Sequence, residues 1–205
     1  MVEDAGGFVA RGYDLIARRY ADATIEARSH VTYYKGFLDR CRAMVPGGGR
    51  ILDLGCGAGI VTEELAQWGS VVGADLSFEQ LRLARARVPR AALVQADMTR
   101  LGFIPGSFDA VAAFWSVIHV PRELHAPLLA AVHAWLRPGG VLFGTFGSGD
   151  NPSELDGDFF GAPMYWSHFD AETNRGLLRD AGFTVLQADV VEDAGEHPLW
   201  VIATA

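Results

Sequence analysis

The hydrophobic and polar positions of the chain alternate between short apolar runs and longer segments with helical spacing. Runs short enough to be buried strands lie at 50–54, 71–75, 91–96, 108–115 and 139–146. Segments with the apolar spacing of a helix lie at 59–68, 78–88 and 121–136. Because strands and helices take turns along the chain, the pattern predicts a parallel sheet with helices on both faces.

The C-terminal part of the chain departs from this alternation. A polar insert at 147–169 precedes a helix at 170–181, and two apolar runs follow at 183–190 and 197–204. Only about six residues separate these last two runs, too few for the crossover that parallel strands need. We therefore expect the final pair of strands to be antiparallel.

The N-terminal part reads as two helices, at 8–22 and 24–44, the second ending before Pro46. A chain of 205 residues suffices for one domain with a well-developed core. Half of the residues are hydrophobic and a fifth are charged, as in an ordinary globular protein. We expect a single domain over 1–205, with the first 45 residues as a helical cap.

Composition also bears on location and on metals. No apolar run approaches the roughly 20 residues of a membrane helix, and the N-terminus lacks the layout of a secretory signal. The two cysteines, Cys41 and Cys56, are far from any metal-binding or redox spacing. We expect a cytoplasmic protein with no membrane partner and no metal. Sixteen arginines against one lysine suggest a bacterial source with a GC-rich genome.

The net charge of −8 is unevenly distributed. Residues 148–205 contain eleven acids and only two basic residues, Arg175 and Arg179. Binding to a nucleic-acid backbone requires a basic face, and none is apparent. The charge therefore favours a small-molecule partner over DNA or RNA.

The stretch ILDLGCGAGI at 51–60 places an acid and three glycines at the end of the first predicted strand. Gly55, Gly57 and Gly59 allow a sharp turn and close approach of a ligand, although such turns also occur for structural reasons alone. Asp75 ends the next strand, 20 residues after Gly55, where an acid can accept hydrogen bonds from ribose hydroxyls. Asp97 ends the third strand, where its side chain can meet the edge of a purine base.

A dinucleotide-binding domain is the nearest competing interpretation. Its G-x-G-x-x-G pattern needs a glycine at position 60, where this chain has Ile60. Asp53, just before the turn, would repel a pyrophosphate but suits an ammonium group. These residues favour an amino-acid-bearing nucleoside over NAD.

Five motifs then occur in register and in order over about 50–150. They are ILDLGCGAG, GADLS at 73–77, QADM at 95–98, FDAVAAFWSVIHV at 108–120 and LRPGGVLFGTF at 136–146. With them the chain resembles the class I S-adenosylmethionine-dependent methyltransferases, in the small-molecule group that includes quinone-biosynthesis enzymes. The resemblance implies a Rossmann-like α/β fold with a seven-stranded mixed sheet, order 3-2-1-4-5-7-6, and an antiparallel seventh strand.

The resemblance also implies the residues that hold the cofactor, S-adenosyl-L-methionine, and its product, S-adenosyl-L-homocysteine. Those expected around the methionine portion are Asp53, Gly55, Cys56, Gly57 and Gly59. Those expected around the ribose and adenine are Asp75, Leu76, Asp97 and Met98. The segment YDLIARRYAD stands where many relatives have a tyrosine-containing cap helix. Tyr20 is expected at the cofactor carboxylate and Tyr13 at the substrate, unless both belong to a core face with Phe8 and Ile16.

Methyl transfer from a sulfonium is an in-line displacement, so alignment and exclusion of water supply much of the catalysis. The crevice of such a sheet opens between strands one and four, which brings Trp115, Ser116 and His119 beside the methyl group. His119 is the candidate base for a hydroxyl acceptor. The alternative is a structural histidine that caps the loop before Pro121.

The insert at 147–169 leaves the fifth strand, where acceptor-binding loops fall in this architecture. Its second half is rich in aromatic residues, of which most must pack the insert onto the rest of the protein. Tyr165, Trp166 and His168 are the candidates for facing the substrate.

The sequence therefore predicts methyl transfer to a small molecule, with a hydroxyl oxygen as the first choice. Methylation of nitrogen or sulfur is the second choice, and a protein that binds the cofactor without transferring methyl is a third. Monomer and homodimer both remain open.

Overall fold

The computed structural model describes residues 4–28, 32–192 and 195–205. Its main sheet has the strand order β3-β2-β1-β4-β5-β9-β8. The strands are β1 (Gly49–Leu54), β2 (Gly69–Asp75), β3 (Ala92–Gln95), β4 (Phe108–Ala113), β5 (Leu136–Phe146), β8 (Thr184–Val190) and β9 (Leu199–Thr204). β9 runs antiparallel to both of its neighbours, β5 and β8, and the other pairs are parallel. The predicted order and the antiparallel last strand are confirmed.

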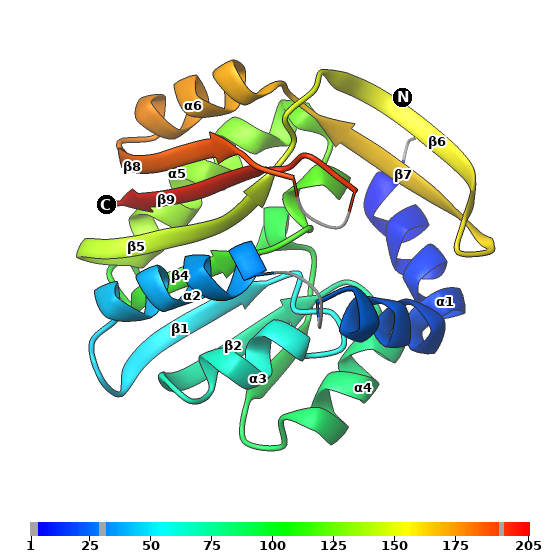
Figure 1. Ribbon diagram of the computed structural model, residues 1–205, viewed down its shortest axis with the longest axis horizontal. Helices are drawn as coiled ribbons and strands as arrows, with labels where there is room; N and C mark the ends of the chain where they lie inside the picture. Colours follow the sequence, from blue (N-terminus) through cyan, green and yellow to red (C-terminus); the bar gives the residue numbers. More distant parts are fainter. Residues whose placement is uncertain (1–3, 29–31, 193–194) are drawn as a thin grey trace.

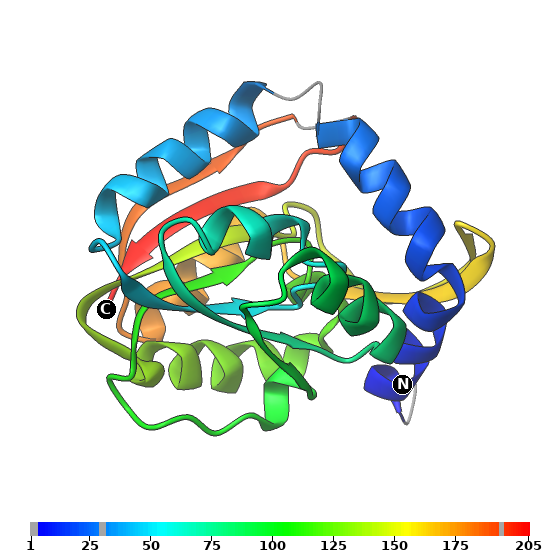
Figure 2. The ribbon, with the colours of Figure 1, turned by 90° about the horizontal axis from the view of Figure 1, so that it is seen from below.

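Helices cover both faces of the sheet, as predicted (Figure 1). One face carries α2 (Thr32–Met44), α3 (Ile60–Leu65) and α4 (Phe78–Arg87), and the other carries α5 (His125–Trp135) and α6 (Ala171–Asp180). In Figure 2 the sheet lies between α2 and α5. No helix among the described ranges has both the length and the apolar character that crossing a membrane requires.

Alternation of side chains along the strands produces two separate cores. Leu52 and Leu142 point into the layer with α5 and α6, whereas their neighbours Ile51 and Phe143 point into the layer with α2 and α3. Trp200 on β9 is fully buried in the second layer, where α2 packs its aromatic residues against it. Continuous apolar strands are what a sheet covered on both faces requires.

The N-terminal cap differs from the prediction. Instead of a break at residue 23, α1 continues over Ala5–Arg28, and α2 begins at Thr32. The Thr24 hydroxyl donates a hydrogen bond to the carbonyl of Tyr20, four residues earlier, so its polar group is satisfied within the helix. α1 packs against α4 and β7.

The insert also differs, since 151–168 forms an antiparallel hairpin of β6 (Asn151–Phe159) and β7 (Ala162–His168). Phe160 and Gly161 join the strands with φ of 53° and 87°, the left-handed conformations of a tight hairpin turn. In Figures 1 and 2 the hairpin and α1 lie together beyond one end of the sheet. These two segments form what we call the roof, α1 with β6 and β7.

We expect Phe143→Ala to lower the free energy of unfolding by about 3–5 kcal/mol, because Phe143 is fully buried between Trp68 and Phe114. Phe78→Ala is the matched control, since Phe78 on α4 is 58% exposed, and we expect a change within about 0.5 kcal/mol. Urea unfolding followed by circular dichroism measures both. Equal losses in the two variants would contradict the two-layer core.

Candidate functional site

The turn after β1 forms the floor of the candidate site. Gly55 and Gly57 have φ of 69° and 52°, and the amides of Gly55 and Cys56 both donate to the carbonyl of Ala74 at the end of β2. A Cβ on Gly55 would lie 2.2 Å from Cβ of Ser116, so the turn is packed directly against the loop after β4. Only glycine fits there, for reasons of both space and conformation.

Two residues that the resemblance assigned to the cofactor lie beneath this turn. Asp53 is 1% exposed and accepts a hydrogen bond from the Thr62 hydroxyl at 2.7 Å. Gly59 has φ of 78°, and a Cβ on it would lie 3.1 Å from Ala84 of α4. Neither residue lines the cavity described below. Asp53 and Gly59 hold the turn in place against α3 and α4, and their assignment to the cofactor stays a prediction.

Asp75 joins the turn after β1 to the start of α4. Its carboxylate accepts hydrogen bonds from the amides of Gly57 at 2.8 Å and Ser77 at 2.9 Å. Burial raises the pKa of Asp75 from 3.8 to about 6, against the lowering effect of these two amides, and the nearby Asp14 carboxylate raises it further. A buried carboxylate of this kind gains from additional hydrogen-bond donors such as ribose hydroxyls.

A cavity of about 520 Å³ lies over the turn, beneath α1. The predicted cofactor residues that line it are Tyr20, Gly55, Cys56, Gly57, Asp75, Leu76, Asp97, Met98 and Trp115. Tyr13, Ser116 and His119, predicted to lie near the methyl group and the substrate, line it as well. The structure thus brings together most of the residues that the motifs indicated.

Gln80 lines the same cavity and was missed from the sequence. It is 1% exposed, and neither polar atom of its side chain has a hydrogen-bond partner among the described residues. Ser77 and Gln80 have the spacing of a capping box, in which the glutamine side chain reaches back to the serine amide. Here that amide donates to Asp75 instead, which leaves the Gln80 side chain unpaired beside the cavity.

Asp14 attaches α1 to the rest of the site. One of its carboxylate oxygens accepts hydrogen bonds from the Ser77 hydroxyl at 2.6 Å and from the amide of Glu79 at 3.1 Å. This carboxylate therefore lies at the N-terminus of α4, where the helix dipole favours negative charge. The sequence offered no signal for this role beyond an acid on a helix.

A second cavity, of about 720 Å³, lies between α1 and the hairpin. It shares its boundary with the first cavity at Tyr13, Tyr20, Thr24, Trp115 and His119, all of which line both. Its other walls include the aromatic side chains Phe146, Phe159, Phe160 and Trp166.

The three insert residues predicted to face the substrate fall in different places. Trp166 and His168 line the second cavity, but Tyr165 lines neither cavity and is almost fully buried against α1. Successive side chains of a strand point to opposite faces, so Tyr165 and Trp166 cannot share one. The Tyr165 side chain therefore lies away from both cavities, and its carbonyl contacts His119.

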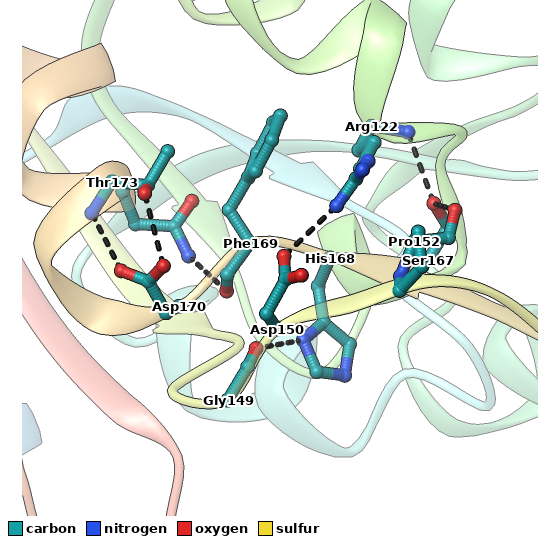
Figure 3. A network of polar contacts seen from close by, with 10 residues as sticks. Arg122, Gly149, Asp150, Pro152, Ser167, His168, Phe169, Asp170 and Thr173 are labelled. Carbon is teal, nitrogen blue, oxygen red and sulfur yellow. Dashed lines mark hydrogen bonds and ion pairs between the residues drawn. The ribbon is translucent and has the colours of Figure 1, made fainter.

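Polar contacts attach the base of the hairpin to the body of the protein (Figure 3). Arg122, just before α5, pairs with Asp150 at 2.8 Å, and its amide donates to the Ser167 hydroxyl at 3.1 Å. A ring nitrogen of His168, Nδ1, lies 2.8 Å from the carbonyl of Gly149. The wall of the second cavity is therefore held at both strands of the hairpin.

His119 lies where the two cavities meet, with both ring nitrogens engaged. Nδ1 is 2.8 Å from the carbonyl oxygen of Tyr165, and Nε2 is 2.8 Å from the hydroxyl of Tyr13. A carbonyl only accepts, so Nδ1 carries the proton and Nε2 accepts a hydrogen bond from Tyr13. The alternative role beside Pro121 belongs to another histidine, since His125 contacts the carbonyl of Val120.

Burial sets the ionisation of this pair. It lowers the pKa of His119 to about 4, so the imidazole is neutral at pH 7. Burial also raises the pKa of Tyr13 well above its usual value, with a further contribution from Tyr20. The ring of Trp166 lies against that of His119 at a tilt of 35°, with centroids 4.4 Å apart. The arrangement is a neutral base beside a tyrosine that keeps its proton.

Comparison with known proteins agrees with this geometry. Residues 51–140 match the family model described as a methyltransferase domain. A curated relative from Xanthomonas campestris pv. campestris, the ubiquinone biosynthesis O-methyltransferase, is 37% identical over 108 residues, which cover 50% of this chain and 44% of the relative. The chain thus spans less than half the length of the curated relatives it matches.

Solved structures share the fold over more of the chain. A complex titled DhpI–SAH has a TM-score of 0.80 at 18% identity and covers 99% of this chain and 98% of that one. An S-adenosylmethionine-dependent methyltransferase from Mesorhizobium loti has a TM-score of 0.68 at 22% identity, covering 86% and 99%. The matched methyltransferase domain and the shared fold confirm the predicted resemblance to class I S-adenosylmethionine-dependent methyltransferases.

We expect the affinity for S-adenosylhomocysteine to depend on the ionisation of Asp75. A raised pKa favours the protonated, folded form, so this group's contribution to stability is present below pH 3.8 and is lost as the pH rises through about 6. Ribose hydroxyls favour the carboxylate, so affinity should rise between pH 5 and 6, by at most about tenfold per unit, and level off above. Calorimetry across pH 5–8 measures this.

Asp75→Asn should weaken binding at pH 7 at least about tenfold, because a charged hydrogen-bond acceptor is lost, and should abolish the pH dependence. Asp180→Asn, at the end of α6, is the control and should retain both the affinity and its pH dependence. An unchanged pH dependence in Asp75→Asn would contradict the role of this carboxylate.

Proposed function

We propose, from the resemblance to class I methyltransferases, that this protein transfers a methyl group from S-adenosylmethionine to a hydroxyl oxygen of a small aromatic molecule. The observation that carries the proposal is the junction of two cavities at Tyr13 and His119. The first cavity contains the acid and glycines of a nucleoside site, the second has aromatic walls, and a neutral imidazole lies between them.

The residues of the first cavity fit the cofactor. Asp75 would accept hydrogen bonds from the ribose hydroxyls, and the side-chain amide of Gln80 has no hydrogen-bond partner among the described residues. Asp97 and Met98 would hold the adenine, and Tyr20 the carboxylate of the methionine portion. When bound, S-adenosylmethionine supplies a methyl group on a positively charged sulfur, which leaves as a neutral thioether when the acceptor oxygen takes the methyl carbon.

The second cavity favours a neutral aromatic acceptor over an anion. Aromatic rings from α1 and the hairpin surround it, and such rings prefer edge or offset contacts with another aromatic group. Its described lining includes the carboxyl groups of Glu154, Asp156 and Glu196 and contains no lysine or arginine. Carboxylates in the lining disfavour an acceptor of like charge.

A hydroxyl acceptor is the group that benefits most from the base at the junction. A hydroxyl must lose its proton as the new bond forms, and His119 at the junction is neutral, although burial makes it a weaker base than an ordinary histidine. Curated relatives are named ubiquinone biosynthesis O-methyltransferases, which supports oxygen as the acceptor atom. A phenol combines this atom with the aromatic character of the cavity.

Incubating the protein with S-adenosylmethionine and a panel of aromatic alcohols, amines and thiols tests the proposal by mass spectrometry. We expect methyl ethers of phenols. His119→Gln should lower kcat about 10²–10⁴-fold, the usual contribution of a general base, with affinity for S-adenosylhomocysteine within about twofold. His133→Gln on α5 is the control and should retain kcat.

Products methylated only on nitrogen or sulfur would contradict the choice of oxygen. Binding of the nucleoside with no methylated product from the whole panel would favour a cofactor-binding protein that does not transfer methyl.

A further inference from the structure

We propose that Tyr13 transfers the proton of the acceptor to His119, so that the imidazole acts through the tyrosine hydroxyl rather than by touching the acceptor. The inference rests on the proposed function and adds a catalytic role for Tyr13, with His119 as the terminal proton acceptor. Tyr13 comes from α1, His119 from the loop after β4, and the carbonyl of Tyr165 from β7.

Both nitrogens of His119 are already occupied in the ligand-free protein. Nδ1 donates to the carbonyl of Tyr165, and Nε2 accepts from the hydroxyl of Tyr13, each over 2.8 Å. Trp166 covers one face of the ring, and the Tyr13 ring meets it edge-on with centroids 5.3 Å apart. An acceptor could reach Nε2 only by breaking the bond to Tyr13 within a buried site.

The hydroxyl of Tyr13 is a better point of contact for the acceptor. A phenol oxygen that donates its proton to Nε2 still has lone pairs, one of which can accept from the acceptor beside the side-chain hydrogen bond with Tyr20. Tyr13 lines both cavities, so it borders the space for the cofactor and the space for the acceptor. An acceptor hydroxyl in the second cavity can therefore donate to Tyr13 without disturbing the imidazole.

The proton transfer balances without ionising the tyrosine. The acceptor proton passes to the Tyr13 oxygen while the Tyr13 proton passes to Nε2 of His119. Tyr13 ends neutral, His119 ends as an imidazolium, and the positive charge lost from the methyl donor is matched by the one gained on the ring. Nδ1–H continues to donate to the Tyr165 carbonyl, which stabilises that charge.

The direction of the pKa shifts of Tyr13 and His119 agrees with this proton transfer. Burial raises the pKa of Tyr13 well above its usual value, so a tyrosinate is not populated and the residue only relays a proton. Burial lowers the pKa of His119 to about 4, so at pH 7 the imidazolium returns its proton through Tyr13 to solvent once the product leaves. The site is thereby reset with His119 neutral.

The simpler role for the same contacts is mechanical. The Tyr13–His119 bond also ties the roof to the loop after β4, and a tie of this kind requires no proton transfer. The two roles differ in what Tyr13→Phe should change. A purely structural hydrogen bond predicts the same fall in kcat for every acceptor. A proton relay predicts the largest fall in kcat for the acceptors with the highest pKa.

The first test reads the hydrogen bonds directly, by NMR of ¹⁵N-labelled imidazole in the ligand-free protein at pH 7. We expect His119 to be neutral with its proton on Nδ1, its signals being assigned through His119→Gln. Tyr13→Phe should shift the Nε2 resonance and leave Nδ1 in place. Tyr33→Phe, which removes a hydroxyl from α2, should shift neither. A proton on Nε2, or an Nε2 resonance unmoved in Tyr13→Phe, would overturn the proposal.

The second test uses S-adenosylmethionine with a series of substituted phenols, from weakly acidic phenols to 4-nitrophenol. In Tyr13→Phe we expect kcat to fall about 10²-fold or more for weakly acidic phenols and little for 4-nitrophenol, with KM within about twofold. The double variant with His119→Gln should lose no more than the worse single variant, because the two residues act as one unit. Calorimetric affinity for S-adenosylhomocysteine should stay within about twofold.

Equal losses across the phenol series, or additive losses in the double variant, would overturn the relay while leaving the proposed function in place. If the native protein methylates no phenol of the series, the proposed function fails and the relay fails with it. The two failures are therefore distinguishable, since the first still yields methyl ethers from the native protein.

Discussion

A buried carboxylate is the interaction on which the site depends. Asp75 binds the amides of Gly57 and Ser77 and so sets both the turn after β1 and the start of α4. Ser77 in turn donates to Asp14, which brings α1 over the cavity. Burial raises the pKa of Asp75 to about 6, so keeping this group ionised at neutral pH costs folding free energy. A ligand that donates hydrogen bonds to the carboxylate recovers part of that free energy.

The roof adds a second cavity to the one that lies over the turn after β1. The match to the methyltransferase domain ends at residue 140 and begins at 51, so α1 and the β6–β7 hairpin both lie outside it. These are the segments that enclose the second cavity and supply most of its aromatic walls. The Tyr13–His119–Tyr165 hydrogen bonds join both parts of the roof to the loop after β4. The proposed recognition of the acceptor therefore rests on segments outside the matched domain.

The sheet was predictable because its strands are covered on both faces and so read as continuous apolar runs. The hairpin was not, since β6 is mostly exposed and its residues carry no such run. In the site, the turn and Asp75 followed from motif spacing, but Asp53 and Gly59 proved to support the turn from beneath. Gln80 and Asp14 escaped notice because their roles depend on contacts between elements distant in sequence. Which of the neighbours Tyr165 and Trp166 faces the cavity depends on the register of the strand. Neither residue propensity nor composition specifies that register.

A crystal structure with S-adenosylhomocysteine tests most directly whether the two cavities serve one transfer reaction. We expect the nucleoside in the first cavity, with its ribose hydroxyls within hydrogen-bond distance of the Asp75 carboxylate. We also expect the sulfur to point to the junction at Tyr13 and His119, from which the second cavity opens. A nucleoside bound elsewhere, or a sulfur that faces away from this junction, would contradict the account.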